Sequence, residues 1–500
     1  MGGGGRDKHQ AELYIGAHAA PEREAPDMLS ITLDAGGKVP LVSQIVAAVA
    51  EQIAEGVLAP GARLPSVRQL AAECSVSTLT VSNAYNRLVA EGYLEARRAS
   101  GYYVAMRKAA REPQRRQAQN SVPIDALWLL QRVYEDDPNL LKVGSGWLPE
   151  SHLFTDGLRH SLSALAKKPA SAVSRYGNPH GYEPLRRAIQ MLLAQRAIDC
   201  EPDNIILTHG ASQALDIAAR GLLQAGDTAF VDDPGYCNLF PTLRALGVRI
   251  IGIPRTPQGP DVEALEALAE RYRPRVFFTN TILHNPTGTG CPPAVIYRVL
   301  RVAEDFDFHI VEDDIFAGMA PDQMPSIASL DQFRRVLYAG SFSKTISPSL
   351  RVGYLVVGRD LVERMLYLKL AGGLTSSEIS EQVVHSILVD GHHRLHLARL
   401  RDKLAVAQKT VCAGLENAGL SIFHRPNGGM FVWAALPGAP DMEAVAHQAM
   451  EEGIMLAPGA LFRADQKATP FMRFNVTHAD HPRLYRFLER VCERALREKA

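Results

Sequence analysis

The sequence predicts two folded parts. The first is a small helical head that ends in a β-hairpin, and the second is a large α/β domain with a mainly parallel sheet, helices on both faces and a smaller α+β lobe. Residues 40–104 contain three amphipathic helical segments followed by two short strand-like runs. Between residues 205 and 357, seven apolar strand-like runs alternate with helical patterns, which is typical of a parallel sheet covered on both faces.

The order of elements in the head predicts a winged helix-turn-helix. The first helix, expected over 40–55, repeats an apolar residue every four positions. The second helix follows Ser66, a residue type that caps helix N-termini. The third helix is expected from Thr78 to about Glu91, and residues 92–104 read as two strands around a basic turn. Helix, helix-turn-helix and hairpin in this order form the winged motif.

Polar and basic side chains on this head suit contact with DNA. The third helix presents short polar residues and an arginine, which fit base edges and phosphates in a major groove. Residues 97–116 hold seven basic residues and one acidic residue in a chain whose formal net charge is zero, so the positive field is local. A helical interaction module with an ordinary solvated face is the alternative interpretation. The expected DNA contacts are Arg63, Ser66, Arg68, Thr78, Thr80, Ser82, Asn83, Arg87, Arg97 and Arg98.

Residues 40–104 resemble the GntR-type winged helix over nearly the whole length of that domain. The run LPSVRQLAAECSVSTLTVSNAYNRLVAEGYLEARRASGYYV carries much of the resemblance. The family often has arginine where Thr78 stands, which affects the expected operator sequence and not the fold. The resemblance implies that the head binds double-stranded DNA.

Four motifs follow strands of the large domain and together suit an aldehyde cofactor with a phosphate. Thr208-His-Gly-Ala-Ser-Gln opens a helix, whose amides and positive end can receive the phosphate. His284-Asn-Pro-Thr-Gly offers an amide donor, and Val311-Glu-Asp-Asp offers a carboxylate that keeps a pyridine nitrogen protonated. Ser341-Phe-Ser-Lys places an amine among hydroxyls, where it can attack an aldehyde. Each motif alone is compatible with a plain turn or a surface residue, but together they predict one crevice at the strand ends.

In this order the motifs resemble those of fold-type I, class I/II aminotransferases, which bind pyridoxal 5′-phosphate, over residues 140–500. Joined to the GntR head, the whole chain is similar to the MocR subfamily of transcriptional regulators. The resemblance implies that Lys344 is the catalytic lysine that holds the cofactor, that Asp313 contacts its pyridine nitrogen and that Asn285 contacts its O3′ oxygen. The other implied cofactor residues are Tyr236 on the ring face, Gly210, Ala211, Ser212, Ser341, Ser343 and Arg351 at the phosphate, and Tyr176 at the phosphate of the partner subunit. Arg473 is implied to bind a substrate carboxylate and Gly146 to line the substrate pocket.

One position departs from the aminotransferase pattern. The family usually has a tyrosine two or three residues after the aspartate, and Ile315 and Phe316 occupy both positions here. Loss of the phenol is expected to leave the cofactor bound but to change its reactivity. We therefore interpret the chain as a DNA-binding regulator that senses pyridoxal 5′-phosphate or its adduct with a small amine or amino acid effector. The alternative is an active aminotransferase that carries a DNA-binding head.

The expected organisation is a flexible N-terminus (1–37), the winged helix (38–105), a polar linker (106–139) and the cofactor-binding domain (140–500). The resemblance implies a head-to-tail homodimer, and its two-fold symmetry predicts an operator with two half-sites. Six scattered cysteines without a CxxC pair fit the reducing cytoplasm, and no apolar run is long enough for a membrane span. No metal site is expected, since adjacent histidines on a basic helix, such as those at 392, 393 and 396, are more often solvated.

Overall fold

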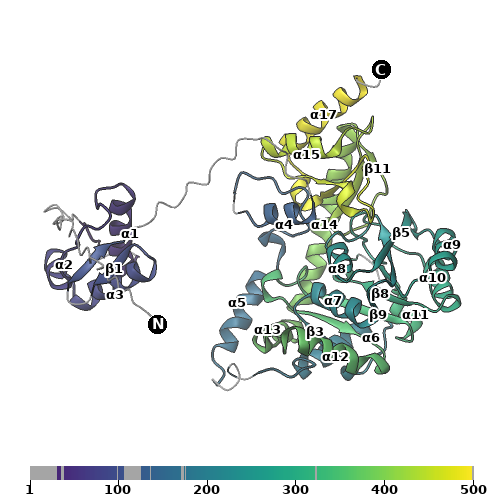
Figure 1. Ribbon diagram of the computed structural model, residues 1–500, viewed down its shortest axis with the longest axis horizontal. Helices are drawn as coiled ribbons and strands as arrows, with labels where there is room; N and C mark the ends of the chain where they lie inside the picture. The colour runs from purple at the N-terminus through teal and green to yellow at the C-terminus, as the bar shows by residue number, and fades with distance from the viewer. Residues whose placement is uncertain are drawn as a thin grey trace, which may run out of the picture. The chain divides into compact units, whose positions relative to one another are not determined.

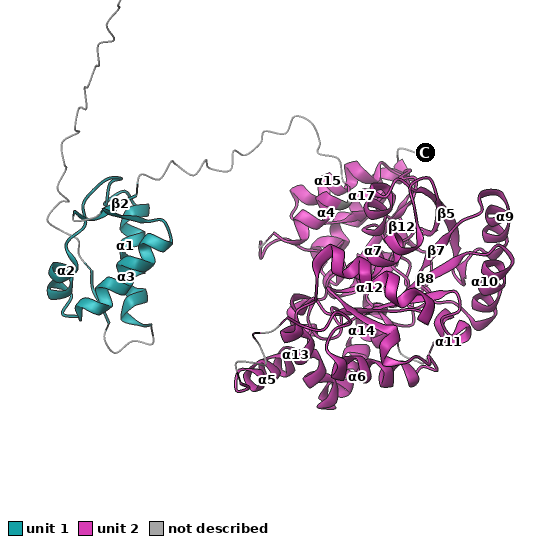
Figure 2. Ribbon diagram, turned by 60° about the horizontal axis from the view of Figure 1, so that its bottom comes forward, with its two compact units in different colours: residues 1–120 teal, residues 121–500 magenta. Residues whose placement is uncertain are grey.

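The structure is a computed structural model that describes residues 31–34, 39–97, 100–105, 125–135, 137–169, 174, 176–320 and 324–497. The chain forms two compact units, residues 1–120 and 121–500 (Figure 2). The N-terminus expected to be flexible lies almost wholly outside the described residues, as do Arg98 and most of the first part of the expected linker.

The first unit has the elements of the predicted winged helix-turn-helix. Ser66 accepts a hydrogen bond from the amide of Gln69 at 3.2 Å and so caps the second helix, as expected. Tyr85 is the largest side chain of the apolar core between the helices and the hairpin, and its hydroxyl donates to the carbonyl of Pro65 at 3.0 Å. The elements are α1 (Leu41–Ala54), α2 (Val67–Glu73), α3 (Thr78–Ala90) and the antiparallel pair β1 (Leu94–Arg97) and β2 (Gly101–Val104).

The second unit is built on an eight-stranded sheet with the order β3-β10-β9-β8-β7-β4-β5-β6 (Figure 1). The five strands from β9 to β5 are parallel, while β10 and β6 run antiparallel to their neighbours. All seven strands predicted from the sequence are confirmed. The strands are β3 (Ile205–Thr208), β4 (Thr228–Asp233), β5 (Arg249–Thr256), β6 (Gly259–Pro260), β7 (Val276–Thr279), β8 (His309–Asp313), β9 (Val336–Ser341) and β10 (Gly353–Val356).

Helices cover both faces of this sheet, because neighbouring residues of each buried strand point to opposite sides and both are apolar. On β3, Ile205 and Leu207 face one core and Ile206 faces the other. The first core is covered by α6 (Glu183–Ala194), α9 (Val262–Tyr272), α10 (Pro293–Asp305), α11 (Ile327–Asp331) and α13 (Glu378–Val389). The second core is covered by α7 (Ala211–Leu222), α8 (Leu239–Ala245) and α12 (Arg359–Gly373).

The predicted smaller α+β lobe is also confirmed. Its four-stranded antiparallel sheet has the order β11-β12-β14-β13 and shares a core with the long helix α14 (His392–Asn417). The remaining elements of the lobe are β11 (Ser421–Ile422), β12 (Phe431–Ala435), β13 (Ala457–Pro458), β14 (Phe471–Asn475), α15 (Met442–Glu451), α16 (Val476–Ala479) and α17 (Pro482–Arg497). No helix in the described ranges is long and apolar enough to cross a bilayer.

The prediction of a linker over 106–139 is wrong in its second half. Helix α4 (Ala126–Val133) begins after Asp125, whose carboxylate accepts a hydrogen bond from the amide of Trp128 at 2.7 Å. Trp128 is buried in a core with Met455 and Phe462 of the smaller lobe. Residues 125–139 therefore belong to the second unit, because α4 buries apolar side chains against segments far along the chain.

Candidate functional site

A cavity of about 720 Å³ lies at the carboxyl ends of the central parallel strands. Its wall brings together residues from the ends of β8 and β9, the start of α7 and the smaller lobe, as the strand-end argument predicts. The sequence-predicted residues on this wall are Gly146, Ala211, Ser212, Tyr236, Asn285, Asp313, Ser341, Ser343, Lys344, Arg351 and Arg473.

Lys344 follows β9 and is held with its amine inside the cavity. Its Nζ donates a hydrogen bond to the carbonyl of Gly146 at 2.6 Å. Burial lowers the pKa of Lys344 to about 8, and the positive charges of Arg473 and Arg351 act in the same direction. A large share of the amine is therefore neutral near pH 8, the form that attacks an aldehyde.

Asp313, the last residue of β8, is a buried carboxyl group with an unmet hydrogen-bonding need. Burial, followed by the negative charge of Asp314, raises the pKa of Asp313 to about 7. Its Oδ1 atom is buried and has no hydrogen-bond partner in the structure. A protonated pyridine nitrogen supplies both the missing donor and a positive charge, so the residues present fit pyridoxal 5′-phosphate.

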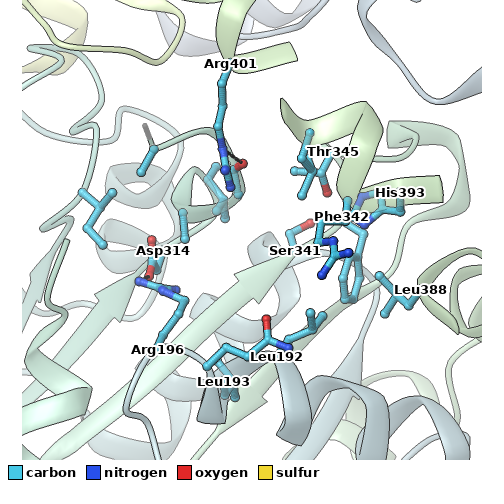
Figure 3. A pocket seen from close by; sticks show the side chains of 18 of the residues that line it. Leu192, Leu193, Arg196, Asp314, Ser341, Phe342, Thr345, Leu388, His393 and Arg401 are labelled. Atoms are coloured by element: carbon cyan, nitrogen blue, oxygen red, sulfur yellow. Dashed lines mark hydrogen bonds and ion pairs between the residues drawn. The ribbon is translucent and has the colours of Figure 1, made fainter. Parts of the chain in front are cut away.

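The neighbouring Asp314 points to the other side of the strand and takes no part in the cofactor cavity. One of its oxygens lies 2.7 Å from a guanidinium nitrogen of Arg196 (Figure 3). The same oxygen accepts a hydrogen bond from Tyr338, also at 2.7 Å. It lines a separate cavity of about 620 Å³, which shares Ile315 and Ser341 with the cofactor cavity. The alternation of side chains along β8 thus leaves Asp313 as the carboxylate that faces the cofactor cavity.

The expected phosphate residues form a cradle at the start of α7. Gly210 precedes this helix with φ of 76°, and no side chain caps the helix amides there. A Cβ on Gly210 would lie 2.8 Å from a guanidinium nitrogen of Arg351, so a side chain there would shift the guanidinium from its present position. Ser341 Oγ donates to Ser343 Oγ at 3.0 Å beside them. Two hydroxyls, a guanidinium and a helix N-terminus suit a phosphate dianion. Gly210 itself shapes the cradle without lining the cavity.

Arg473 is a buried cation on the wall of the same cavity. One guanidinium nitrogen donates to Oδ1 of Asn285 at 2.9 Å and the other to the carbonyl of Gly144 at 2.6 Å. The guanidinium carbon lies 4.6 Å from the ring centres of both Phe431 and Phe462, and the residue is 3% exposed. Within the described part of the chain no carboxylate pairs with it. A ligand carboxylate is therefore the natural counterion.

Aromatic and apolar side chains that the sequence singles out also line the cavity. Tyr236 lines the cavity, and burial raises the pKa of its phenol to about 12, so the hydroxyl stays neutral. Asn238 donates to this hydroxyl at 3.3 Å. Ile315 and Phe316 also line the cavity, and Phe316 packs edge-on against Phe431 with 5.6 Å between ring centres. Apolar side chains thus occupy the positions where related enzymes place a phenol.

Tyr176 does not line the cavity of its own chain. It is 86% exposed, on a loop that is fastened to the large domain at Pro179, whose carbonyl accepts a hydrogen bond from the buried amine of Lys369 at 2.6 Å. Its contact with the cofactor phosphate of a partner subunit stays a prediction.

In the first unit, the outward side of α3 carries the expected groove contacts. Two of them are engaged locally: Thr80 Oγ1 lies 2.8 Å from Ser77 Oγ, and Arg87 Nε donates to Glu91 at 2.8 Å. Two residues on this side, Leu79 and Asn86, were not among the contacts expected from the sequence. The exposed or half-buried side chains of the outward side are Thr78, Leu79, Thr80, Ser82, Asn83, Asn86 and Arg87.

The expected phosphate-binding arginines are exposed. Arg63 pairs with Tyr103 of the hairpin through a backbone bridge, and Arg97 lies over the same ring at 4.3 Å. Arg68 lies on α2. Arg98 is outside the described residues. The wing therefore carries at least two guanidinium groups, which suit phosphates or a minor groove.

Besides Ile315 and Phe316, nine residues on the wall of the cofactor cavity were not predicted from the sequence as site residues. Four belong to α4 and the residue after it, because that segment was predicted to be a linker. The signal was present in the amphipathic run ALWLLQRV. The missed residues are Leu129, Leu130, Val133, Tyr134, Trp147, Cys237, Asn238, Pro348 and Ser349.

Comparisons with known proteins agree with this geometry. The family of aminotransferases class I and II matches residues 150–491, and the bacterial regulatory proteins of the gntR family match residues 41–104. The uncharacterized HTH-type transcriptional regulator YdcR of Escherichia coli (strain K12) is 30% identical over 446 residues, which cover 86% of this chain and 94% of that protein. The probable rhizopine catabolism regulatory protein MocR of Rhizobium meliloti is 28% identical over 446 residues, covering 86% of this chain and 88% of that protein.

The chain belongs to the MocR subfamily of GntR transcriptional regulators. The second unit of this MocR-type chain has the fold of solved aminotransferases. The kynurenine aminotransferase of Pyrococcus horikoshii, solved in complex with PMP, superimposes with a TM-score of 0.69 at 26% identity, covering 76% of this chain and 96% of that one.

Proposed function

We propose that this MocR-type regulator changes its binding to DNA in response to a small amine or amino acid, which it detects through pyridoxal 5′-phosphate held by Lys344. One observation carries the proposal. A half-buried amine, a half-buried carboxyl group with one unpaired oxygen and a buried guanidinium share one cavity, in a chain whose other unit is a GntR head. When bound, the cofactor supplies an aldehyde that amines attack and a ring that withdraws electrons.

The residues of the site divide into those for the cofactor and those for the effector. Asp313 and the cradle around Arg351 would orient the ring and its phosphate. Asn285 accepts a hydrogen bond from Arg473 and would contact the O3′ side of the ring, so it would link cofactor and effector. Arg473 would bind the carboxylate of an amino acid effector.

The apolar residues beside Asp313 favour sensing over turnover. Related enzymes use a phenol near O3′ to tune the reactivity of the bound cofactor, and Phe316 cannot donate a hydrogen bond there. Full transamination is the second candidate function, because the lysine, aspartate and arginine of an aminotransferase site are all in place. Amino-acid half-reactions followed by visible absorbance separate the two. Steady multiple turnover would favour the enzyme.

The regulator is proposed to act in the cytoplasm as a head-to-tail homodimer. The fold family supports a dimer, and two heads suit an operator with two half-sites. Tyr176, exposed on a loop fastened by Lys369, is the residue proposed to complete the partner's phosphate site.

Electrophoretic mobility shift of DNA from upstream of the chain's own gene, with and without pyridoxal 5′-phosphate, tests the proposal. We expect specific binding whose affinity changes with the cofactor and an added amine. Lys344→Ala should lose the visible absorbance of the bound cofactor and the response, while Lys409→Ala, at an exposed position of α14, should keep both. Binding of no upstream fragment, or unchanged absorbance in Lys344→Ala, would contradict the proposal.

A further inference from the structure

We infer that α4 and Trp147 form a subsite for an apolar effector side chain, so that this regulator responds to an aliphatic or aromatic amino acid and not to an acidic or basic one. The inference rests on the proposed function, because it names the ligand class of the same cavity.

The cavity wall has four charged groups, and each of them already has a role in binding the cofactor or the effector carboxylate. They are Asp313, Lys344, Arg351 and Arg473. Asp313, Lys344 and Arg351 serve the ring, the aldehyde and the phosphate of the cofactor, and Arg473 serves the carboxylate of the effector. A second carboxylate or an ammonium on the effector side chain therefore finds no further countercharge on the wall that this chain provides.

The part of the wall formed by α4 and Trp147 is apolar or aromatic, and the remaining polar residues of the wall carry no charge. Tyr134 and Trp147 meet edge to face with 4.7 Å between their ring centres, and this pair continues the apolar surface of the helix. Ile315 and Phe316 close the side next to Asp313. The residues contributed by α4 and its C-terminal end are Leu129, Leu130, Val133 and Tyr134.

The subsite is rigid enough to discriminate between ligands. On its other side α4 buries Trp128 in the core of the smaller lobe. At its C-terminal end, Lys142 Nζ donates to the carbonyls of Val133 at 2.8 Å and Glu135 at 2.6 Å. A helix fixed at both a core and an end cannot easily withdraw to admit water around a charged side chain. An uncompensated charge there carries the full cost of desolvation.

Isothermal titration calorimetry on the full-length protein loaded with pyridoxal 5′-phosphate tests the subsite. Carboxylates without an α-amine avoid chemistry on the cofactor while keeping the contact with Arg473. We expect 4-methylpentanoate and 3-phenylpropanoate to bind at least about tenfold more tightly than glutarate and 5-guanidinopentanoate, since a misplaced polar group in such a pocket costs more than one factor of ten.

Two variants on the same helix sharpen the test. Leu130→Arg places a cation in the subsite and should reverse the preference towards glutarate. Leu127→Arg is the matched control, because Leu127 is 60% exposed and lies outside the cavity wall. Both variants should keep the visible absorbance of the bound cofactor.

The outcomes distinguish this inference from the proposed function. If the unmodified protein shows no visible absorbance of bound pyridoxal 5′-phosphate, the proposed function itself is overturned. With the cofactor bound, a preference for glutarate or 5-guanidinopentanoate, equal responses of the two arginine variants, or binding of none of the four carboxylates would overturn the apolar subsite alone.

Discussion

At Lys344, burial and two nearby guanidinium groups act together on one amine. Its pKa of about 8 lies well below the 10.5 of an ordinary lysine. Only the neutral amine attacks an aldehyde, so capture of pyridoxal 5′-phosphate by the cofactor-free protein should accelerate as the pH rises and level off above about pH 8. Stopped-flow absorbance across this range measures the profile. A rate that keeps rising towards pH 10 would show that the amine is not perturbed.

We expect Asp313 to lower the stability of the cofactor-free protein at neutral pH and to strengthen its binding of pyridoxal 5′-phosphate. Because its folded pKa, about 7, is raised from 3.8, the stability it contributes is present in acid and is lost as the pH rises from about 4 to 7. Asp313→Asn removes this titration. The variant should therefore melt at a higher temperature than the unmodified protein at neutral pH without cofactor, with a gap that shrinks towards pH 4. It should also bind pyridoxal 5′-phosphate more weakly, and equal cofactor affinity would contradict the assigned role.

At the scale of the element, α4 depends on its contact with the smaller lobe. Trp128 is 6% exposed among Met455, Phe462 and other apolar residues. Trp128→Ala should destabilise the second unit by roughly 3–5 kcal/mol, the usual cost of removing a large buried aromatic side chain. Thermal or denaturant unfolding measures the loss. Leu127→Ala, on the exposed side of the same helix, should change stability by less than about 0.5 kcal/mol.

The same helix shows where sequence reasoning stops. The strands and the four cofactor motifs could be predicted because an apolar run or a short motif is contained in a few neighbouring residues. The burial of α4 could not, because Met455 and Phe462 lie far along the chain and only the fold brings them to Trp128. In the site, too, a local motif could be predicted while a contact between distant segments could not. Arg473 was expected from its motif, while its place between two phenylalanine rings is a tertiary fact.

At the scale of the whole molecule, the two units set what the operator must look like. Each chain carries one compact head, and the fold of the second unit supports a dimer, so two linked heads should bind two half-sites on one DNA. Linked binding makes the second contact intramolecular and adds about 100-fold or more in affinity. Deleting one half-site should therefore weaken binding of the full-length protein by that factor in fluorescence anisotropy. The isolated head, residues 31–120, should bind single and double half-site DNA with equal affinity per site. Equal affinity of the full-length protein for both DNAs would contradict a dimer that engages both half-sites together.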